Sequence, residues 1–530
     1  MKDKDTFDEL QRQKKRKMQT VEQRKSAFDN PAKSAPNRGK AKAKSKRKLD
    51  KKIGIFLTIL QGIVSGIFLW TVFTINLLPT KYLLVVVGIV MALLAITFAT
   101  QKRHKGHAMY GKTLSILMIL ILSVGSFYIG KVNGAFDNVT GGSYKIDSIV
   151  VAVLKDDPAE TIADAKDYTF GVQYAIAGEG VKQAVNSING TLSTTINTVE
   201  LDSIQAQASA LHDGTVKAII YNEGYTGMLA ETFEGYESSI KIIHRHEIKT
   251  EISVKNEAKE FSVTKDTFSV YISGIDVYGA IETNSRSDVN IIATVNPKTN
   301  QILLSTTPRD FFVPIPGVSN GQRDKLTHAG IYGVDASIAT LENLYNTTIP
   351  FYVRVNFTSI IEIVDQLGGV DVYSEYEFTT ADGYYVKAGM NHFNGEEALS
   401  FSRERYNVPG GDDQRGKNQQ AVIVAMIRKL ISPQILMKAS GIIDSVSGNV
   451  ETNMTQKQIQ ELVKMQLNEG CSWSIYSAAA YGTGGSDYTY SMPGMSLYVT
   501  YPDQAAVDNI IQLMDRVEAG EMLDGSEVAE

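Results

Sequence analysis

Three long apolar segments stand near the start of the chain, at residues 53–78, 82–100 and 113–129. Each is close to the ~20 residues that an α-helix needs to cross ~30 Å of hydrocarbon. Core helices of soluble proteins usually keep a polar face, and these segments have almost none. The pattern therefore predicts three membrane-spanning helices within residues 53–131.

Basic residues indicate the orientation of these spans. The loop at 101–112 contains Lys102, Arg103, Lys105 and Lys112, whereas the turn at 79–81 has one positive charge. The positive-inside rule then places the N-terminal segment and this loop in the cytoplasm, and everything after the third span outside. Because more than 50 mostly polar residues precede the first apolar run, we do not expect a cleaved signal peptide.

The segment before the spans is strongly basic, although the whole chain has a formal net charge of −5. Residues 1–52 contain 19 Lys and Arg against seven Asp and Glu. Such a composition offers little apolar surface, so we expect a disordered cytoplasmic tail. Its Lys-rich end next to the first span would also attract anionic lipid headgroups. No nucleic-acid recognition fold accompanies the charge, so nucleic acid is not an expected partner.

The polar and apolar pattern after the spans predicts two further domains, as a chain of 530 residues allows. Residues 143–260 alternate apolar runs with helix-like stretches at 157–166 and 179–188, which indicates a small α/β or α+β accessory domain. His244 and His246 in this part are interpreted as surface or structural residues rather than metal ligands. The polar stretch 249–265 is the expected linker.

Residues 265–520 read as one α/β domain with a mixed sheet, followed by a C-terminal tail at 521–530. The expected strands are extended, β-branched runs at 268–275, 289–295, 301–306, 351–357 and 370–373. The expected helices have apolar residues at helical spacing and lie at 336–345, 358–367, 395–401, 418–430, 456–466 and 504–517. The single cysteine, Cys471, cannot form an internal disulfide and is expected to be a small core residue.

Arginine and aspartate recur together at the ends of these strands. The set consists of Asp276, Arg286, Asp288, Arg309, Asp310, Arg403, Arg405, Asp412, Arg415 and Gln419. Residues two apart on an extended segment project to the same side, so Arg403 and Arg405 should point together while Glu404 points away. Taken singly, each of these residues is equally well explained as part of a surface ion pair.

Several guanidinium groups in one place repel each other unless an anion lies between them. The planar arginine fork fits phosphate oxygens, so a diphosphate is the natural ligand of such a cluster. Asp276 and Asp288 would then hold a divalent cation, Mg²⁺ (or Mn²⁺), because magnesium takes one or two carboxylates and shares phosphate oxygens.

Six short segments of the chain resemble the LytR-CpsA-Psr family in order and approximate spacing. They are Tyr271-Ile-Ser-Gly-Ile-Asp276, Ser285-Arg-Ser-Asp288, Thr307-Pro-Arg-Asp310, Lys325-Leu-Thr-His-Ala-Gly330, Arg403-Glu-Arg405 and Arg415-Gly-Lys-Asn-Gln-Gln420. The resemblance covers residues 265–435 by motif. It is closest to the streptococcal capsule-type CpsA members, which also have three spans and an accessory domain before the catalytic one.

The resemblance implies a function and a set of site residues. The family transfers glycopolymers from a polyprenyl diphosphate carrier to peptidoglycan outside the membrane. By position, Asp276 and Asp288 match the metal-binding carboxylates, and the residues that match the diphosphate site are Arg286, Arg309, Lys325, Arg403, Arg405 and Gln419. Arg403, Arg405, Arg415 and Asp412 are the expected catalytic residues, with Asp412 also a candidate for deprotonating the acceptor hydroxyl.

A polyprenyl carrier also requires an apolar slot. The helical runs 338–344, 360–367 and 422–430 could form its walls, although ordinary core packing is the better explanation for any single one of their residues. Expected partners are the carrier-linked polysaccharide, the peptidoglycan acceptor, the membrane and capsule-assembly proteins.

Two other functions fit the same sequence. With water as acceptor, the site would be a polyprenyl diphosphate phosphatase, which product analysis with and without peptidoglycan distinguishes. Alternatively, the chain is a non-catalytic regulator of capsule synthesis and assembly, in which case variants lacking Asp276 or Arg403 would still support surface polymer display.

Overall fold

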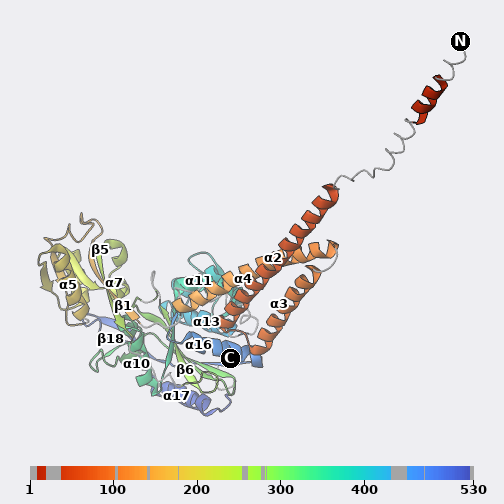
Figure 1. The fold of residues 1–530 in the computed structure, drawn as a ribbon. Helices are drawn as coiled ribbons and strands as arrows, with labels where there is room; N and C mark the ends of the chain where they lie inside the picture. Colours follow the sequence, from red (N-terminus) through yellow and green to blue (C-terminus); the bar gives the residue numbers. More distant parts are fainter. Residues whose placement is uncertain are drawn as a thin grey trace, which may run out of the picture. The chain divides into compact units, whose positions relative to one another are not determined.

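The structure, a computed structural model, describes residues 9–18, 38–101, 105–139, 144–176, 178–252, 261–275, 281, 283–430, 432, 450–470 and 472–525 (Figure 1). Its N-terminal part contains the helices α2 (Arg38–Ile75), α3 (Thr80–Gln101) and α4 (Lys105–Val139). Long enough and apolar enough to cross a membrane are Leu49–Ile75, Thr80–Thr100 and Met109–Lys131. The three predicted spans are therefore confirmed as helices, and their orientation stays a prediction.

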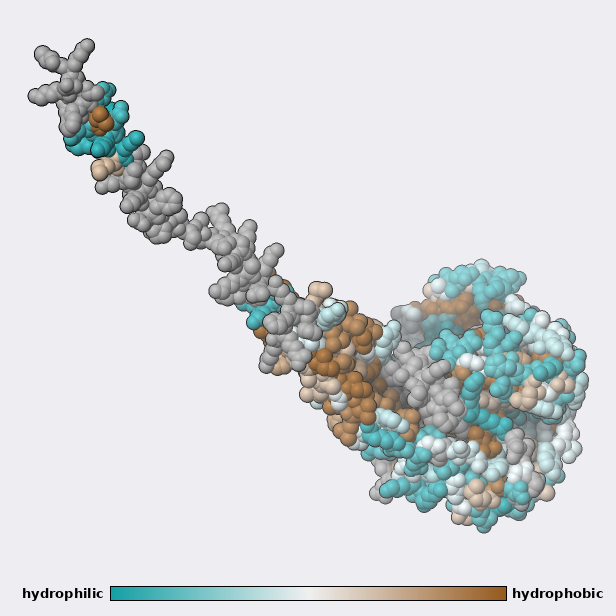
Figure 2. All heavy atoms as spheres, turned by 90° about the vertical axis from the view of Figure 1, so that its right-hand side faces the viewer, coloured by the Kyte–Doolittle hydropathy of each residue, from teal (hydrophilic) through white to brown (hydrophobic). Residues whose placement is uncertain are grey.

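The outward side chains of these helices are mostly apolar, and in Figure 2 their surface is largely brown. Trp70 is 68% exposed and Leu84 is 65% exposed, which would be unfavourable in water and is expected against lipid. The expectation of a disordered tail at 1–52 is wrong where the structure describes it, because residues 9–18 and 38–52 are helical. Lys, Arg, Gln and Ala all have high helix propensity, so these segments form helices although they contain few apolar residues.

A five-stranded mixed sheet follows the spans, in the order β3-β2-β4-β1-β5. Its strands are β1 (Tyr144–Leu154), β2 (Thr169–Val172), β3 (Asn197–Glu200), β4 (Ala218–Asn222) and β5 (Ile240–Glu251). Its helices are α5 (Gly178–Leu192), α6 (Ile204–His212), α7 (Thr226–Thr232) and α8 (Tyr236–Ser239), with the 3₁₀ turn η1 (Glu223–Tyr225) before α7. This part, residues 144–251, is called the accessory region below.

Two predictions in the accessory region are wrong. Residues 157–166 form turns rather than a helix, because the carboxylates of Asp157 and Asp164 accept hydrogen bonds from nearby backbone N–H groups of Ala159 and Thr161. The expected linker at 249–265 begins inside β5, and residues 253–260 of it lie outside the described residues.

A six-stranded mixed sheet, as predicted, forms the centre of the C-terminal part in the order β16-β11-β6-β7-β8-β17. Its strands are β6 (Phe268–Ile275), β7 (Ser287–Asn296), β8 (Gln301–Thr307), β11 (Phe351–Asn356), β16 (Val450–Thr452) and β17 (Ser474–Ala479). Shorter elements are β9 (Phe312–Pro314), β10 (Arg323–Lys325), α9 (Leu326–Ala329), η3 (Gly330–Tyr332), β12 (Val370–Ser374), β13 (Phe378–Thr379), β14 (Tyr385–Val386), β15 (Gly389–Phe393), β18 (Gly482–Tyr488) and β19 (Ser496–Pro502).

Helices cover both faces of this sheet because its central strands are apolar on both sides. On β6, Val270 and Ile272 point to one face, where α11 (Phe357–Gln366), α12 (Gly395–Arg403), α13 (Asp412–Leu430) and α16 (Gln456–Glu469) contribute to the core. Tyr271 points to the other face, toward α10 (Val334–Tyr345) and α17 (Gln504–Ala519). The predicted strands and helices are confirmed, with α13 beginning six residues earlier than expected and α12 continuing to Arg403. Cys471 lies outside the described residues.

The accessory region packs directly on the C-terminal part. Met492 and Ile331 are buried in the same apolar cluster as the core residues of β1 and β4. Lys145 of β1 donates to the Asp335 carboxylate at 2.9 Å and to the Tyr332 carbonyl at 2.8 Å. The two parts therefore share an apolar cluster and an ion pair.

The edge strand β16 is fixed by a buried ion pair. Arg354 of β11 and Glu451 of β16 are 3% and 4% exposed at their side chains, with Nη2 and Oε2 3.0 Å apart. The Tyr352 hydroxyl donates to the same carboxylate at 2.8 Å. Val450 and Thr452 on either side of Glu451 line the cavity described below.

We expect Glu451→Ala to lower the free energy of unfolding by about 3–5 kcal/mol, because it leaves the Arg354 charge buried without its partner. Chemical denaturation of the full chain in detergent measures this. The control is Glu461→Ala, which removes an exposed carboxylate 3.9 Å from Lys457 and should change stability by less than about 1 kcal/mol. Equal effects of the two substitutions would contradict the prediction.

Candidate functional site

Asp288, the second residue of β7, is the centre of the site. Its Oδ1 accepts hydrogen bonds from Arg309 Nη1 at 3.0 Å and from Thr327 Oγ1 at 3.1 Å. Strand pairing places Arg309 there, since Asn290 of β7 faces Thr307 of β8 and two more residues bring the chains to Asp288 and Arg309. Thr327 arrives from α9, whose first turn follows β10.

Three largely buried cations gather around this point, each paired with a carboxylate, and Arg309 also lies 3.7 Å from Asp310. Arg309 pairs with Asp288, Lys325 Nζ lies 2.5 Å from Asp310 Oδ1, and Arg286 forms an ion pair with Glu231. The side chains of Arg286, Arg309 and Lys325 are 18%, 8% and 8% exposed. We call these three residues the cationic cluster. The sequence had assigned all three to a diphosphate site.

The electrostatics of the cluster keep its acids ionised. Burial alone would raise the pKa of Asp288, but the charges of Arg309, Arg286 and Arg415 outweigh burial and hold that pKa well below its usual range. At Glu231, the charges of the cationic cluster likewise outweigh the effect of burial and lower the pKa to about 2. Both carboxylates are therefore charged at neutral pH.

The accessory region contributes Glu231, which sequence reasoning missed. Helix α7 presents Glu231 and Gly227 one turn apart, and the guanidinium of Arg286 lies against both. A β-carbon at position 227 would lie 2.8 Å from Arg286 Nη2, so glycine leaves the room that the side chain occupies. A lone glutamate in a segment without catalytic residue types gives no sequence signal.

Helix α13 extends from this site into an apolar region. Arg415, Gln419, Ile423 and Ile427 follow one another every four residues and so lie along one side of the helix. The fifteen helical steps from Arg415 to Leu430 rise by about 22 Å. Gln419 is 1% exposed, and its Oε1 accepts no hydrogen bond from the described residues. One side of α13 is thus polar near its N-terminus and apolar toward its C-terminus.

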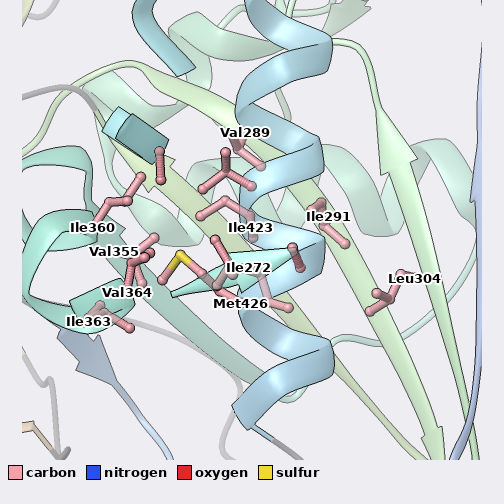
Figure 3. Packing of buried hydrophobic residues seen from close by; sticks show 14 of the residues in the cluster. Ile272, Val289, Ile291, Leu304, Val355, Ile360, Ile363, Val364, Ile423 and Met426 are labelled. Carbon is pink, nitrogen blue, oxygen red and sulfur yellow. The ribbon is translucent and has the colours of Figure 1, made fainter. Parts of the chain in front are cut away.

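The apolar part of α13 borders a cavity of about 460 Å³, within the range of ligand pockets. Figure 3 shows Ile423 and Met426 of α13 close to Ile272 and Val355 of the sheet. The lining comes from β6, β7, β8, β11, β16, α11, α13 and α16 and includes Ile272, Val295, Val353, Ile363, Ile423, Met426, Ile427, Leu430, Leu462 and Trp473. It is almost entirely apolar.

The expected walls of the slot are only partly right. The run 422–430 lines the cavity with four residues and the run 360–367 with Ile363. The run 338–344 does not, because Ile338 and Leu341 pack in the core on the opposite face of the sheet. Periodicity shows that a helix is apolar, but it does not show which face of a sheet the helix covers.

Arg403 and Arg405 flank Glu404, whose hydrogen bonds fix the loop that follows α12. Glu404 is 3% exposed and accepts backbone hydrogen bonds from Ala381, Tyr406 and Asn407. Arg403 is the last residue of α12 rather than part of an extended pair. The guanidinium of Arg405 lies 4.7 Å from the centre of the Tyr406 ring, and no hydrogen bond or ion pair joins it to the cluster among the described residues.

Two predicted site residues cannot be placed. Asp276 lies outside the described residues, and Asp412 begins α13 without a described side chain. The residue before Asp276, Ile275, pairs with Ser287, the residue before Asp288.

Of the two carboxylates expected to bind a divalent cation, the structure describes only Asp288. Asp288 is a buried, ionised carboxylate, and its oxygens are hard ligands of the kind that magnesium prefers. No group of three or more His, Cys, Asp or Glu side chains suited to a metal occurs among the residues that the structure describes. Magnesium needs only one or two carboxylates, so the described half of the site fits it.

Comparison with known proteins identifies the family. The LytR_cpsA_psr family model matches residues 233–492. A polyisoprenyl-teichoic acid–peptidoglycan teichoic acid transferase, TagU of Bacillus anthracis, is 34% identical over 233 residues, covering 44% of this chain and 75% of its own. TagU of Enterococcus faecalis is 38% identical over 202 residues, covering 37% and 65%. The chain belongs to the LytR_cpsA_psr family.

Solved structures are also similar. TagV of B. subtilis is 27% identical with a TM-score of 0.41, covering 49% of this chain and 99% of its own. TagU of B. subtilis is 30% identical with a TM-score of 0.38, covering 49% and 100%.

The Glu404 hydrogen bonds suggest how the arginine loop is held. Burial would raise the pKa of Glu404, but the backbone N–H groups of Asn407, Ala381 and Tyr406 outweigh it, and the pKa is lowered from its ordinary 4.5. A carboxyl whose pKa is lowered by folding stabilises the protein above its unfolded pKa and loses that contribution as the pH falls through the folded value.

We therefore expect Glu404→Ala to lower the free energy of unfolding by about 1–3 kcal/mol at pH 7, because it leaves backbone donors unpaired. The difference from the unsubstituted protein should shrink below pH 4.5, as measured by denaturation at a series of pH values. The control is Glu396→Ala, which removes an exposed acid of α12 that accepts one hydrogen bond, from the Tyr384 hydroxyl, and it should have a smaller effect. A deficit that stays constant down to pH 2 would rule out the charged hydrogen bonds as its cause.

Proposed function

We propose that this protein is a membrane-anchored phosphotransferase that moves a glycopolymer from a polyprenyl diphosphate carrier to peptidoglycan. One observation carries the proposal: cations gather near the polar end of α13, and the apolar end of the same helix lines a large apolar cavity. That arrangement matches an amphiphile with a charged head and a hydrocarbon tail. The names of the relatives, which are polyisoprenyl-teichoic acid–peptidoglycan transferases, support the choice of carrier and acceptor.

The cationic cluster would bind the diphosphate. Arg286 and Arg309 offer planar forks to phosphate oxygens, and Lys325 adds a point charge. Arg415, whose charge reaches Asp288, would extend the cluster along α13. We further propose that Asp288, together with Asp276, holds Mg²⁺ or Mn²⁺. When bound, this cation would supply positive charge that offsets the charge developing on the leaving phosphate.

The proposed reaction is a phosphoryl transfer. A hydroxyl oxygen of the wall glycan forms a bond to the sugar-linked phosphorus, and the bond from that phosphorus to the bridging oxygen breaks. Polyprenyl phosphate leaves with the electron pair, and the hydroxyl proton passes to a carboxylate, for which Asp412 is the candidate. In such a reaction the protein contributes mainly position and charge stabilisation, so Arg403, Arg405 and Arg415 are assigned to stabilising the transition state.

The membrane spans fit this substrate. A polyprenyl carrier stays in the lipid, so an enzyme anchored in the same membrane meets it at a raised effective concentration. The orientation with the site outside the cytoplasm is part of the proposal, and capsule polysaccharide is one polymer that it would accommodate.

Arg403→Ala and Arg405→Ala should each reduce transfer of polymer to peptidoglycan by about 100-fold or more, because each removes charge that stabilises the transition state. Transfer is measured with the full-length protein, a polyprenyl diphosphate-linked glycan and peptidoglycan. Arg516→Ala, which removes a surface arginine paired with Glu521, should retain activity. Full activity of both Arg403→Ala and Arg405→Ala would contradict the assignment of these residues, and product release independent of peptidoglycan would favour a phosphatase.

The cavity predicts a dependence on the length of the lipid tail. Val295 lines the cavity near the end of β7, seven residues from Asp288 and so about 23 Å along the strand. Val295→Phe should therefore weaken binding of long polyprenyl diphosphates and leave geranyl diphosphate binding nearly unchanged. Titration of the full-length protein in detergent with both lipids measures this. If both lipids lose affinity equally, the tail does not extend along this cavity.

A further inference from the structure

The ion pair between Glu231 and Arg286 joins the accessory region to the proposed diphosphate site. Glu231 lies in α7, just before the stretch 233–492 that the family model matches. Arg286 belongs to the matched stretch and to the cationic cluster. A residue from outside the family-wide part of the chain therefore contacts a residue proposed to bind the substrate.

The three acid partners of the cluster differ in how tightly the fold holds them. Asp288 is 4% exposed and accepts two hydrogen bonds, and Asp310 is 11% exposed and directly follows Arg309 in the chain. Glu231 is 36% exposed and comes from a different part of the chain than the cation that it pairs with. Of these three carboxylates, Glu231 is the one that can leave its partner without unpacking the sheet.

Helix α7 also fixes where Arg286 lies. The absence of a side chain at Gly227 lets the guanidinium rest on the helix, and Glu231 holds it from the next turn. Behind it, Gly330 allows close packing of the Arg286 backbone, since a β-carbon there would overlap the Ser285 carbonyl. Arg286 is thereby kept in one position while no anion is bound.

We propose that Glu231 is an exchangeable counter-ion of the diphosphate site. It holds Arg286 in place in the ligand-free protein, and the diphosphate of the carrier displaces it from the guanidinium. Glu231 is therefore a positioning residue that acts through Arg286 and limits the affinity for the anionic headgroup. This inference rests on the proposed function, because it assumes that Arg286 binds the diphosphate.

Removing Glu231 should change the affinity for the ligand in the opposite direction from the loss of a purely structural ion pair. Losing a structural ion pair weakens ligand binding or leaves it unchanged, whereas removing a competing charge strengthens it. A partly exposed pair contributes up to about 1 kcal/mol, which corresponds to about fivefold in affinity. Binding should become tighter for a charged headgroup and remain unchanged for a neutral one.

The test is a titration of the full-length protein in detergent with geranylgeranyl diphosphate and with geranylgeraniol. Glu231→Gln should bind the diphosphate about two- to fivefold more tightly and geranylgeraniol with unchanged affinity, whereas Glu231→Asp should resemble the unsubstituted protein. The matched control is Glu223→Gln, which removes an accessory-region glutamate that is also paired with an arginine, Arg245. Unchanged or weaker diphosphate binding by Glu231→Gln would overturn the inference.

Two further measurements keep the result interpretable. Gly227→Ala, which would push the guanidinium away from α7, should weaken diphosphate binding even if Glu231→Gln folds poorly. In an Arg286→Ala background the gain from Glu231→Gln should be smaller, and an undiminished gain would mean that Glu231 does not act through Arg286. If the unsubstituted protein fails to prefer the diphosphate over geranylgeraniol, the proposed function itself is wrong, whatever Glu231 does.

Discussion

The ion pair between Arg309 and Asp288 is the interaction on which the site depends. Both side chains are less than a tenth exposed, and an unpaired charge at either position would be strongly destabilising. The antiparallel register of β7 and β8 brings them together at one end of the central sheet. Because Asp288 neutralises Arg309, Arg286 and Lys325 can approach with acids of their own. The result is a cationic cluster that is electrically balanced yet can still bind a multivalent anion, since a phosphate group offers several acceptors where a single carboxylate offers two.

Helix α13 connects the cationic cluster to the apolar cavity. Its first turns carry Arg415 and Gln419, and its later turns carry Ile423 and Met426 against the sheet (Figure 3). A cation in the first turn of a helix is unfavourable by itself, because the N-terminus already has a partial positive charge. A bound anion would relieve that cost. The apolar residues further along have no such conflict and leave a cavity instead of filling it, although dense packing is the norm in protein interiors. The cation in the first turn of α13 and the unfilled apolar cavity both favour a ligand with an anionic head and an apolar tail.

The strands, the helices and the cationic cluster were predictable because they follow from local pattern. Extended apolar runs marked β6 and β7, and arginine beside aspartate at strand ends marked Arg286 and Arg309, whereas Lys325 was assigned through the family resemblance. What could not be predicted depends on contacts between distant segments. Nothing near Glu231 in the sequence refers to Arg286, and nothing in residues 338–344 shows that they cover the face of the sheet opposite to the cavity. The turn at 157–166 was missed for another reason, since the side chains of Asp157 and Asp164 compete locally for backbone donors.

The accessory region acquires a physical role from these contacts. Met492 enters its apolar core, Lys145 pairs with Asp335, and Glu231 reaches Arg286, so the region is attached by packing and by charge at several points. Packing contacts fix its position, whereas the Glu231 contact is in electrostatic competition with any anion that Arg286 binds. If the headgroup displaces Glu231, occupancy of the site and binding of a partner to the accessory region are thermodynamically linked, and each changes the affinity for the other by the same factor. A partner that binds the accessory region could use this linkage, because it needs to favour only one of the two states of Glu231.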